Sequence, residues 1–408
     1  MRIGILSEAR AVRGPERSRG RMYSMKINIL GTATTKFGEL WDISPRELAR
    51  EAMSGALRAS GLRPSQIDAL FVGNMLSGIL GNQTNLASLI VEELGAQVPA
   101  FRIEGACASG GLALHNAINS LNAGKYKTVL VLGLEKMTDH SQDEITSALS
   151  AAGSDEERMS GLTFPGIYAL MAKAYMQAYN VSEETLAAVS VKNHYHGSFN
   201  PKAQFQSIIT VGDVMRSPKV ADPLKLLDCS PVSDGASAVV ITSDILIKSK
   251  NPVTIIASEV ATDTLGLYTR KSFTSLSAVV TACQKAYQAA KIKPTDIDVA
   301  EIHDCFSISE AIAVEDLGFS KKGEGAKDIA DGKTTLFKGK IICNPSGGLK
   351  ACGHPVGATG IKQIVEITEQ LRGTAGRRQV KGAKIGLTHN VGGSGAVAAI
   401  HILKGSAI

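Results

Sequence analysis

The stretch Gly61–Asn74, which reads GLRPSQIDALFVGN, recurs further along the chain as Lys291–Asp304, which reads KIKPTDIDVAEIHD. A proline, an isoleucine and an aspartate occupy the same places in both copies. Each copy follows an alanine-rich amphipathic segment (residues 45–60 and 275–290) and reads as a turn followed by a short buried strand. The pattern predicts one helix–turn–strand unit that occurs twice.

The similarity extends beyond these two stretches. A predicted helix from Ala108 to about Leu121 precedes a buried strand at 127–133, and a second helix from Ala358 to about Leu371 precedes a strand at 383–388. Strands that alternate with helices predict an α/β protein. A chain of 408 residues fits two domains better than one core. We expect two copies of one unit, at residues 25–250 and 251–408.

The first copy is longer because of a polar stretch at about 137–220, which contains Met, Tyr, His and Pro residues. We interpret it as an insertion that covers a site, with helices at 165–180 and 183–195. Residues 1–24 carry six arginines against two glutamates. They are interpreted as a disordered extension or as a start site chosen too early, with the first strand beginning near Met25.

Composition excludes several classes of protein. The net charge is only +6, and no basic face with interleaved aromatic residues indicates nucleic-acid binding. No apolar run approaches the length of a membrane span. The six cysteines form no C-x-x-C pair, which favours a reducing compartment. We therefore expect a soluble, cytoplasmic protein.

Two short motifs carry candidate chemistry. Cys107 lies in the sequence GACASGG at a predicted strand-to-helix turn, where the helix dipole is expected to lower the pKa of a thiol. His354 lies in GHPVGATG, just before the second predicted helix. A lone cysteine is more often an inert packing residue, and a lone histidine is more often a satisfied polar residue. The two motifs together support the hypothesis of a nucleophile and its base.

Further candidates follow the predicted strands. The sequence His303-Asp304-Cys305-Phe306 ends the second copy of the repeat, and α/β sheets bind ligands at the carboxyl ends of their strands. His389 and Asn390 precede Gly392 and Gly393 after the last of these strands. A rival hypothesis is a zinc site formed by His303, Cys305, Cys352 and His354. The spacing within each pair is shorter than usual for zinc, so we expect no metal.

Three motifs in order give the chain a family resemblance: CASGG at 107–111, LLDCSPVSDGA at 226–236 and GHPVGATG at 353–360. From Met25 to Leu403 the chain resembles the thiolases. The resemblance implies the thiolase fold, in which two duplicated α/β halves form five α-β-α-β-α layers with an inserted loop domain. It also implies coenzyme A thioester substrates and no other cofactor.

The chain departs from the biosynthetic thiolases at two places. It has His-Asp-Cys-Phe at 303–306 where they carry Asn-Glu-Ala-Phe, and His389-Asn390 where they carry a catalytic cysteine. A second cysteine at position 305 is similar to the sterol-carrier-protein type and the archaeal type of thiolase. The archaeal enzymes are associated with acetoacetyl-CoA formation for mevalonate synthesis.

The resemblance implies reversible condensation of two acetyl-CoA molecules to acetoacetyl-CoA and coenzyme A. Cys107 would carry the acetyl group, His354 would take the Cys107 proton, and Cys305 would remove the α-proton of the second acetyl-CoA. His303 and His354 would polarise the thioester oxygen of that molecule. The backbone N–H groups of Cys107 and of Gly392 or Gly393 would form the other oxyanion hole, and Ser230 would contact the pantetheine arm.

Two other functions stay open. One is a 3-ketoacyl-CoA thiolase for longer or specialised acyl chains. The other is a thiolase-fold subunit that mainly scaffolds an acyl-CoA complex, although the intact cysteines and His354 argue against it. The resemblance further implies a homo-oligomer, dimer or tetramer. It also implies similarity to proteins that work in a complex with hydroxymethylglutaryl-CoA synthase and a small OB-fold partner.

Overall fold

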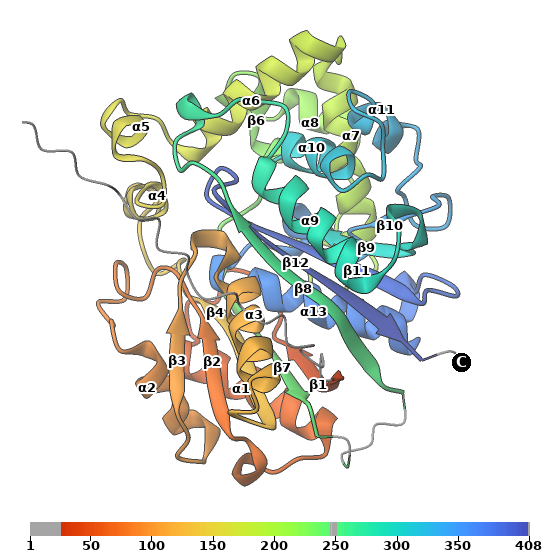
Figure 1. The fold of residues 1–408 in the computed structure, drawn as a ribbon. Coiled ribbons are helices and arrows are strands. Elements are labelled where there is room, and N and C mark those ends of the chain that lie inside the picture. Colours follow the sequence, from red (N-terminus) through yellow and green to blue (C-terminus); the bar gives the residue numbers. More distant parts are fainter. Residues whose placement is uncertain (1–25, 245, 247–250, 407–408) are drawn as a thin grey trace, which may run out of the picture.

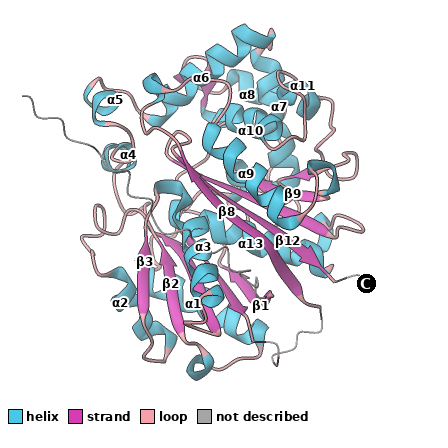
Figure 2. Cartoon of the chain, in the orientation of Figure 1, coloured by secondary structure: helices cyan, strands magenta, loops and turns pink. Residues whose placement is uncertain are grey.

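The computed structural model describes residues 26–244, 246 and 251–406. Ten strands form one mixed sheet in the order β10-β9-β11-β12-β8-β1-β7-β4-β2-β3 (Figures 1 and 2). The strands of the first half are β1 (Ile27–Thr34), β2 (Ala69–Gly73), β3 (Ala100–Ile103), β4 (Thr128–Glu135) and β7 (Gly235–Thr242). Those of the second half are β8 (Val253–Thr262), β9 (Val299–Ile302), β10 (Ile342–Cys343), β11 (Ile385–Gly392) and β12 (Val397–Gly405). The predicted α/β class is confirmed.

The two halves repeat the same strand order and direction. In each half four strands run in one direction and one strand, β7 or β12, runs opposite to them. Strand β1 pairs antiparallel with β8 where the halves meet. The repeated aspartate has the same role in both. Asp68 accepts the N–H groups of Lys127 and Thr128 at 2.8 and 2.9 Å. Asp298 accepts those of Lys384 and Ile385 at 2.7 and 2.9 Å. The repeated sequence therefore folds into one repeated unit.

Helices cover the sheet in layers. Helix α1 (Pro45–Ser60) packs on the outer face of the first half and α9 (Ser277–Ala290) on that of the second, while α3 (Ser109–Asn122) and α13 (Val356–Arg372) lie between the halves. Strand β4 shows how this is encoded. Its Val129 and Val131 face the central helices, whereas Leu130 and Leu132 face α1. Strands buried on both faces read as continuous apolar runs. The expected five layers are present.

The two central helices touch at glycines in their first turns. A Cβ atom on Gly110 would lie 2.8 Å from the carbonyl oxygen of Gly357, and one on Gly360 would lie 2.3 Å from the nitrogen of Gly111. Only glycine permits this approach of one backbone to the other. The starts of α3 and α13 are thereby held together, which brings together the loops that carry Cys107 and His354.

The stretch between β4 and β7 holds five helices and a two-stranded ribbon: α4 (Gln142–Ser150), α5 (Asp155–Met159), α6 (Phe164–Tyr179), α7 (Glu183–Gly197), α8 (Val211–Arg216), β5 (Lys219–Ala221) and β6 (Leu224–Lys225). The helices predicted at 165–180 and 183–195 are present as α6 and α7. Both share a core with α9 and α10 (Ser307–Asp316), and they lie with α11 (Gly325–Ala330) at the top of Figure 1.

Two further short α-helices are α2 (Leu86–Val91) and α12 (Gly348–Cys352). Within the described part, no helix combines the length and the apolar character that crossing a membrane requires. The extension expected at residues 1–24 lies outside the described residues, so its nature stays a prediction.

Candidate active site

Cys107 lies in a 3₁₀ turn, Ala106–Ala108, directly before α3. Ala106 has a positive φ of 52°, an uncommon conformation for a residue with a Cβ that is found at functional turns. Ser109 braces the turn: its hydroxyl accepts the Gly105 N–H at 3.0 Å and donates to the Ala106 carbonyl at 2.6 Å. The turn holds the half-buried Cys107 at the N-terminal end of α3.

The expectation of a lowered Cys107 pKa is wrong for the free protein. Burial raises the pKa of the Cys107 thiol, and the nearby Cys305 raises it further. The N–H of Gly393 acts in the opposite direction but does not prevail. Removal of the thiol from water is the largest influence on this pKa, so Cys107 rests as a thiol and needs a base before it can attack.

His354 is oriented by its own helix. Its Nδ1 lies 2.7 Å from the hydroxyl of Thr359, which donates its proton to the Pro355 carbonyl at 3.0 Å. The hydroxyl therefore accepts from His354 Nδ1–H, which leaves Nε2 with a free lone pair. His354 Nε2 is buried and has no protein partner. Burial, together with the charge of Lys362, lowers the His354 pKa to about 3, so the ring is neutral around pH 7.

Three of the predicted residues converge. The Cys107 sulfur and ring nitrogens of His303 and His354 all lie within 4.8 Å of one another. The two imidazole rings have centroids 5.0 Å apart and are nearly perpendicular, at 83°. The arrangement places a thiol, a base and a second imidazole around one small space.

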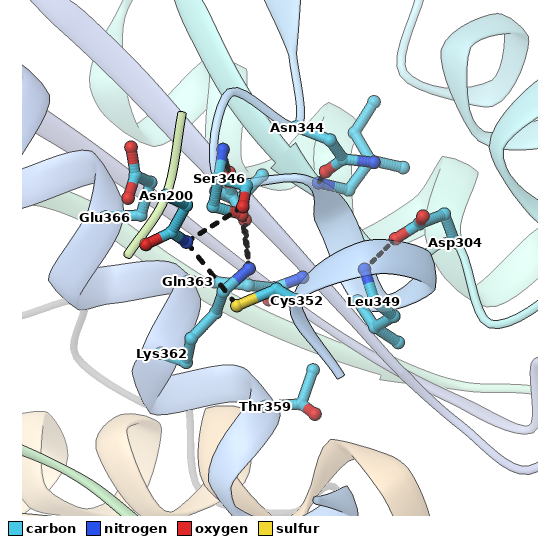
Figure 3. Close-up of polar contacts among 12 residues, drawn as sticks. Asn200, Asp304, Asn344, Ser346, Leu349, Cys352, Thr359, Lys362, Gln363 and Glu366 are labelled. Carbon is cyan, nitrogen blue, oxygen red and sulfur yellow. Dashed lines mark hydrogen bonds and ion pairs between the residues drawn. The ribbon is translucent and has the colours of Figure 1, made fainter. Parts of the chain in front are cut away.

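The rival zinc hypothesis required Cys305 and Cys352 to join the two histidines. In the described part of the chain, the potential metal ligands that lie close together are Cys107, His303 and His354, and neither Cys305 nor Cys352 is among them. Cys352 instead lies with its sulfur 3.6 Å from the side-chain amide of Asn200, in the polar cluster of Figure 3. The structure therefore does not assemble the four-residue set.

Cys305 lies directly before α10, close to the first thiol. Its sulfur is 3.4 Å from the Ser309 hydroxyl, and it is near enough to Cys107 to raise the pKa of that thiol. Burial raises the Cys305 pKa, while hydrogen bonding by Ser309 and Tyr168 lowers it. The N–H of Ser230 donates to the Cys305 carbonyl at 2.8 Å. The structure thus brings Cys305 and Ser230 to the same site.

The glycine loop after β11 closes over the Cys107 turn. A Cβ on Gly392 would lie 2.3 Å from the Gly105 carbonyl, so this residue has to be glycine. The N–H of Gly393 is near enough to the Cys107 thiol to oppose the rise in its pKa. Backbone N–H groups aimed at one reacting centre are what an oxyanion hole requires. The position of this loop supports the predicted role of Gly393.

Sequence reasoning missed Asp304 as a link between the two histidine motifs. Its carboxylate accepts the N–H of Leu349 and the amide of Asn193, each at 2.6 Å, and Figure 3 shows the first contact. A Cβ on Gly348 would collide with this carboxylate at 2.4 Å. Asp304 thus fastens the 303–306 segment to α12, which leads into His354. The position of Asp304 between His303 and Cys305 could have indicated a role at the site. The residues that it contacts, however, are distant in the sequence and could not be predicted from it.

Tyr168 was also missed. It comes from α6 of the inserted stretch and is almost fully buried. Its ring stacks on Phe306 with centroids 4.6 Å apart. Its hydroxyl donates to the Gly393 carbonyl at 3.0 Å. The insertion therefore reaches the site through one aromatic side chain.

Two family models cover this arrangement. The thiolase N-terminal domain matches residues 27–244, and the thiolase C-terminal domain-like model matches residues 260–405. The chain belongs to the thiolase family.

The chain is similar over nearly its whole length to proteins named acetyl-CoA acetyltransferase. The relative from Methanothermobacter thermautotrophicus is 48% identical over 93% of this chain and 99% of its own. The relative from Methanocaldococcus jannaschii is 45% identical over 93% of this chain and 98% of its own. Among solved structures, an Ltp2-ChsH2(DUF35) aldolase superposes with a TM-score of 0.80 at 24% identity, and covers 93% of this chain and 98% of that one. At that identity the likeness concerns the fold.

Proposed function

We propose that this protein is an acetyl-CoA C-acetyltransferase, which reversibly condenses two acetyl-CoA molecules to acetoacetyl-CoA and coenzyme A. The observation that carries the proposal is the grouping of the Cys107 thiol with His303 and His354 within 4.8 Å, next to the second thiol of Cys305. The names of the two relatives at 48% and 45% identity support the same reaction. Coenzyme A thioesters are the substrates, and the chemistry requires no other cofactor.

In the first half-reaction His354 Nε2 accepts the Cys107 proton as the sulfur attacks the thioester carbon. The carbonyl oxygen becomes an oxyanion, held by the N–H groups of Cys107 and Gly393 or Gly392. When the intermediate collapses, the bond to the coenzyme A sulfur breaks, and that sulfur takes the proton from His354. The products are acetyl-Cys107 and coenzyme A, and His354 is again neutral.

In the second half-reaction Cys305 first passes its proton to the neutral His354, and the resulting Cys305 thiolate takes an α-proton from a second acetyl-CoA. His303 stabilises the resulting enolate at the thioester oxygen, and His354 joins it whenever its Nε2 carries a proton. The enolate carbon attacks the carbonyl of acetyl-Cys107 and releases the Cys107 thiolate. The protonated His354 returns its proton to the released Cys107 thiolate, which restores the resting site with both cysteines as thiols and His354 neutral. Ser230, beside Cys305, contacts the pantetheine arm.

A direct assay tests this proposal. The purified chain should form acetoacetyl-CoA from acetyl-CoA and should cleave acetoacetyl-CoA when coenzyme A is added. A much higher rate with a longer 3-ketoacyl-CoA would favour the alternative of a longer-chain thiolase. Absence of both reactions in a folded chain, with acyl-CoA binding retained, would favour the scaffolding alternative.

The position of Tyr168 supports a preference for substrates with short acyl chains. Its ring stacks on that of Phe306, and its hydroxyl is near the Cys305 thiol, so the proposal places this buried stack beside the acyl chain of the substrate. We expect Tyr168→Ala to shift the ratio of kcat/KM for a six-carbon over a four-carbon 3-ketoacyl-CoA about tenfold toward the longer chain, since pocket contacts with each methylene are worth about 1–3 kcal/mol. Tyr168→Phe, which keeps the ring, is the control and should leave the ratio unchanged. An unchanged ratio in Tyr168→Ala would show that the stack does not limit chain length.

The compartment, pathway and assembly belong to the same proposal. We place the protein in the cytoplasm, in acetoacetyl-CoA supply for mevalonate synthesis, as a homodimer or homotetramer. We also propose a complex with hydroxymethylglutaryl-CoA synthase and a small OB-fold partner, which the family resemblance implies. The solved Ltp2-ChsH2(DUF35) aldolase supports only the general idea that a chain of this fold can have a second protein as partner. Light scattering of the purified chain and co-purification with tagged candidate partners test the assembly.

A further inference from the structure

Asn390 contacts three elements of the site at once and had no assigned role. It lies on β11 and is completely buried. Its side-chain oxygen accepts the Gly111 N–H at 3.1 Å, and its side-chain nitrogen donates to the Cys107 carbonyl at 3.0 Å. The same nitrogen lies 3.4 Å from Nδ1 of His303. One amide from the second half thus bridges the nucleophile turn, the first turn of α3 and an active-site histidine.

The orientation of this amide follows from its partners. A backbone N–H can only donate, so the atom that faces Gly111 has to be the oxygen. A backbone carbonyl can only accept, so the atom that faces Cys107 has to be the nitrogen. Both partners select the same orientation, and Asn390 therefore presents an N–H group to His303 Nδ1.

We propose that Asn390 is a positioning residue that fixes His303 in the tautomer with its proton on Nε2. An Nδ1 atom that accepts a hydrogen bond cannot carry a proton in a neutral ring, so the proton resides on Nε2. The ring is neutral because burial, His354 and His389 hold the His303 pKa well below its usual value. His303 Nε2 is buried without a protein partner, in the group formed with Cys107 and His354.

The two histidines thereby receive opposite roles. Thr359 leaves His354 Nε2 with a lone pair, which suits a base, whereas Asn390 leaves His303 Nε2 with an N–H group, which suits the binding of a thioester or enolate oxygen. This catalytic consequence rests on the proposed acetyltransferase function. The tautomer itself does not, and it can be measured in the free protein.

The first test is ¹⁵N NMR of the full chain labelled at histidine, with His303→Asn used to assign the resonances. We expect His303 to show a protonated Nε2 and a bare Nδ1 between pH 6 and pH 8. A protonated Nδ1 in the wild-type protein would overturn the proposal, whatever the activity of the enzyme. A wild-type protein with this tautomer but without condensation activity would support the proposal and contradict the function proposed above.

Asn390→Asp provides the second test. The carboxylate still accepts from Gly111 but cannot donate to His303, and it favours a proton on Nδ1 instead. His303, which also faces His354, His389 and Cys107, would then titrate with a raised pKa. Below that pKa the imidazolium keeps its Nε2–H; above it Nε2 is bare. Condensation by the variant should therefore fall as pH rises, by about 10²–10³-fold at the alkaline end, the usual cost of one lost oxyanion donor.

The wild-type protein should not show this fall in condensation rate as the pH rises. Asn116→Asp, an exposed change on α3, is the matched control for an added charge and should behave as the wild type. A folded Asn390→Asp variant with the wild-type pH profile and an unchanged His303 tautomer would overturn the proposal. If the variant does not fold, the spectrum of the wild-type protein decides.

Discussion

Cys107→Ala is expected to abolish acyl transfer, with a fall in kcat of about 10⁶-fold, the size reached when a covalent nucleophile is removed from other enzymes. Incubation with radiolabelled acetyl-CoA should leave no covalent label on the variant, whereas the wild-type chain should retain one acetyl group. The geometry gives the reason. Cys107 is the thiol grouped with the two imidazoles, and the Gly393 N–H is near enough to favour its thiolate form.

The pKa of Cys107 sharpens this prediction. Because burial raises it, the resting thiol is protonated at neutral pH, and its attack depends on the neutral His354 ring. Iodoacetamide should therefore alkylate Cys107 slowly at pH 7, and the rate should increase as the pH rises toward the raised pKa. Rapid alkylation that is already constant from pH 6 upward would contradict a protonated resting thiol.

A matched control uses another cysteine. Cys283 lies in α9, buried among apolar residues and away from the site. Cys283→Ala should acquire label from acetyl-CoA as the wild type does. Stoichiometric labelling of Cys107→Ala would show that another residue carries the acetyl group, and peptide mapping would then identify it.

The repeat explains why so much of the fold was predictable. Apolar periodicity is local, so the helices at 45–60, 165–180 and 183–195 could be bounded to within a few residues of α1, α6 and α7. The repeated Pro-x-x-Ile-Asp sequence then implied that two such units have the same topology. Small residues after Cys107 and His354 were visible too, and the structure shows that they let α3 and α13 touch.

The parts that were not predictable depend on contacts between distant residues. The direction of the Cys107 pKa shift follows from burial in the assembled site, and a motif at a helix start does not contain that information. The tautomers of His303 and His354 depend on Asn390 and Thr359. Thr359 lies five residues from His354, but Asn390 lies on another strand. A sequence motif names such residues, whereas only the fold shows which atoms face each other.

Cys305→Ala is expected to separate the two half-reactions. The variant should still acquire an acetyl group on Cys107, because the first half-reaction uses only His354 and the glycine loop. Condensation should fall by about 10²–10⁴-fold, the range for loss of a general base. Exchange of the acetyl-CoA methyl protons with deuterated solvent should fall in parallel, and NMR of the recovered acetyl-CoA measures it. Cys343→Ala, a buried change in β10, is the control and should retain labelling, exchange and condensation.

The alternative base for this step is His389, and the structure argues against it. His389 Nδ1 accepts the backbone N–H of His303 at 3.2 Å, so the proton of the neutral ring resides on Nε2. Burial lowers the His389 pKa to about 3, which keeps the ring neutral. A neutral ring with its proton on Nε2 and its Nδ1 lone pair bound to the His303 N–H has no lone pair free to take an α-proton. Cys305 is the better base because a thiolate that forms there is stabilised by Ser309 and Tyr168. Near wild-type condensation by Cys305→Ala would reverse this assignment, and His389→Asn would then be expected to abolish methyl-proton exchange.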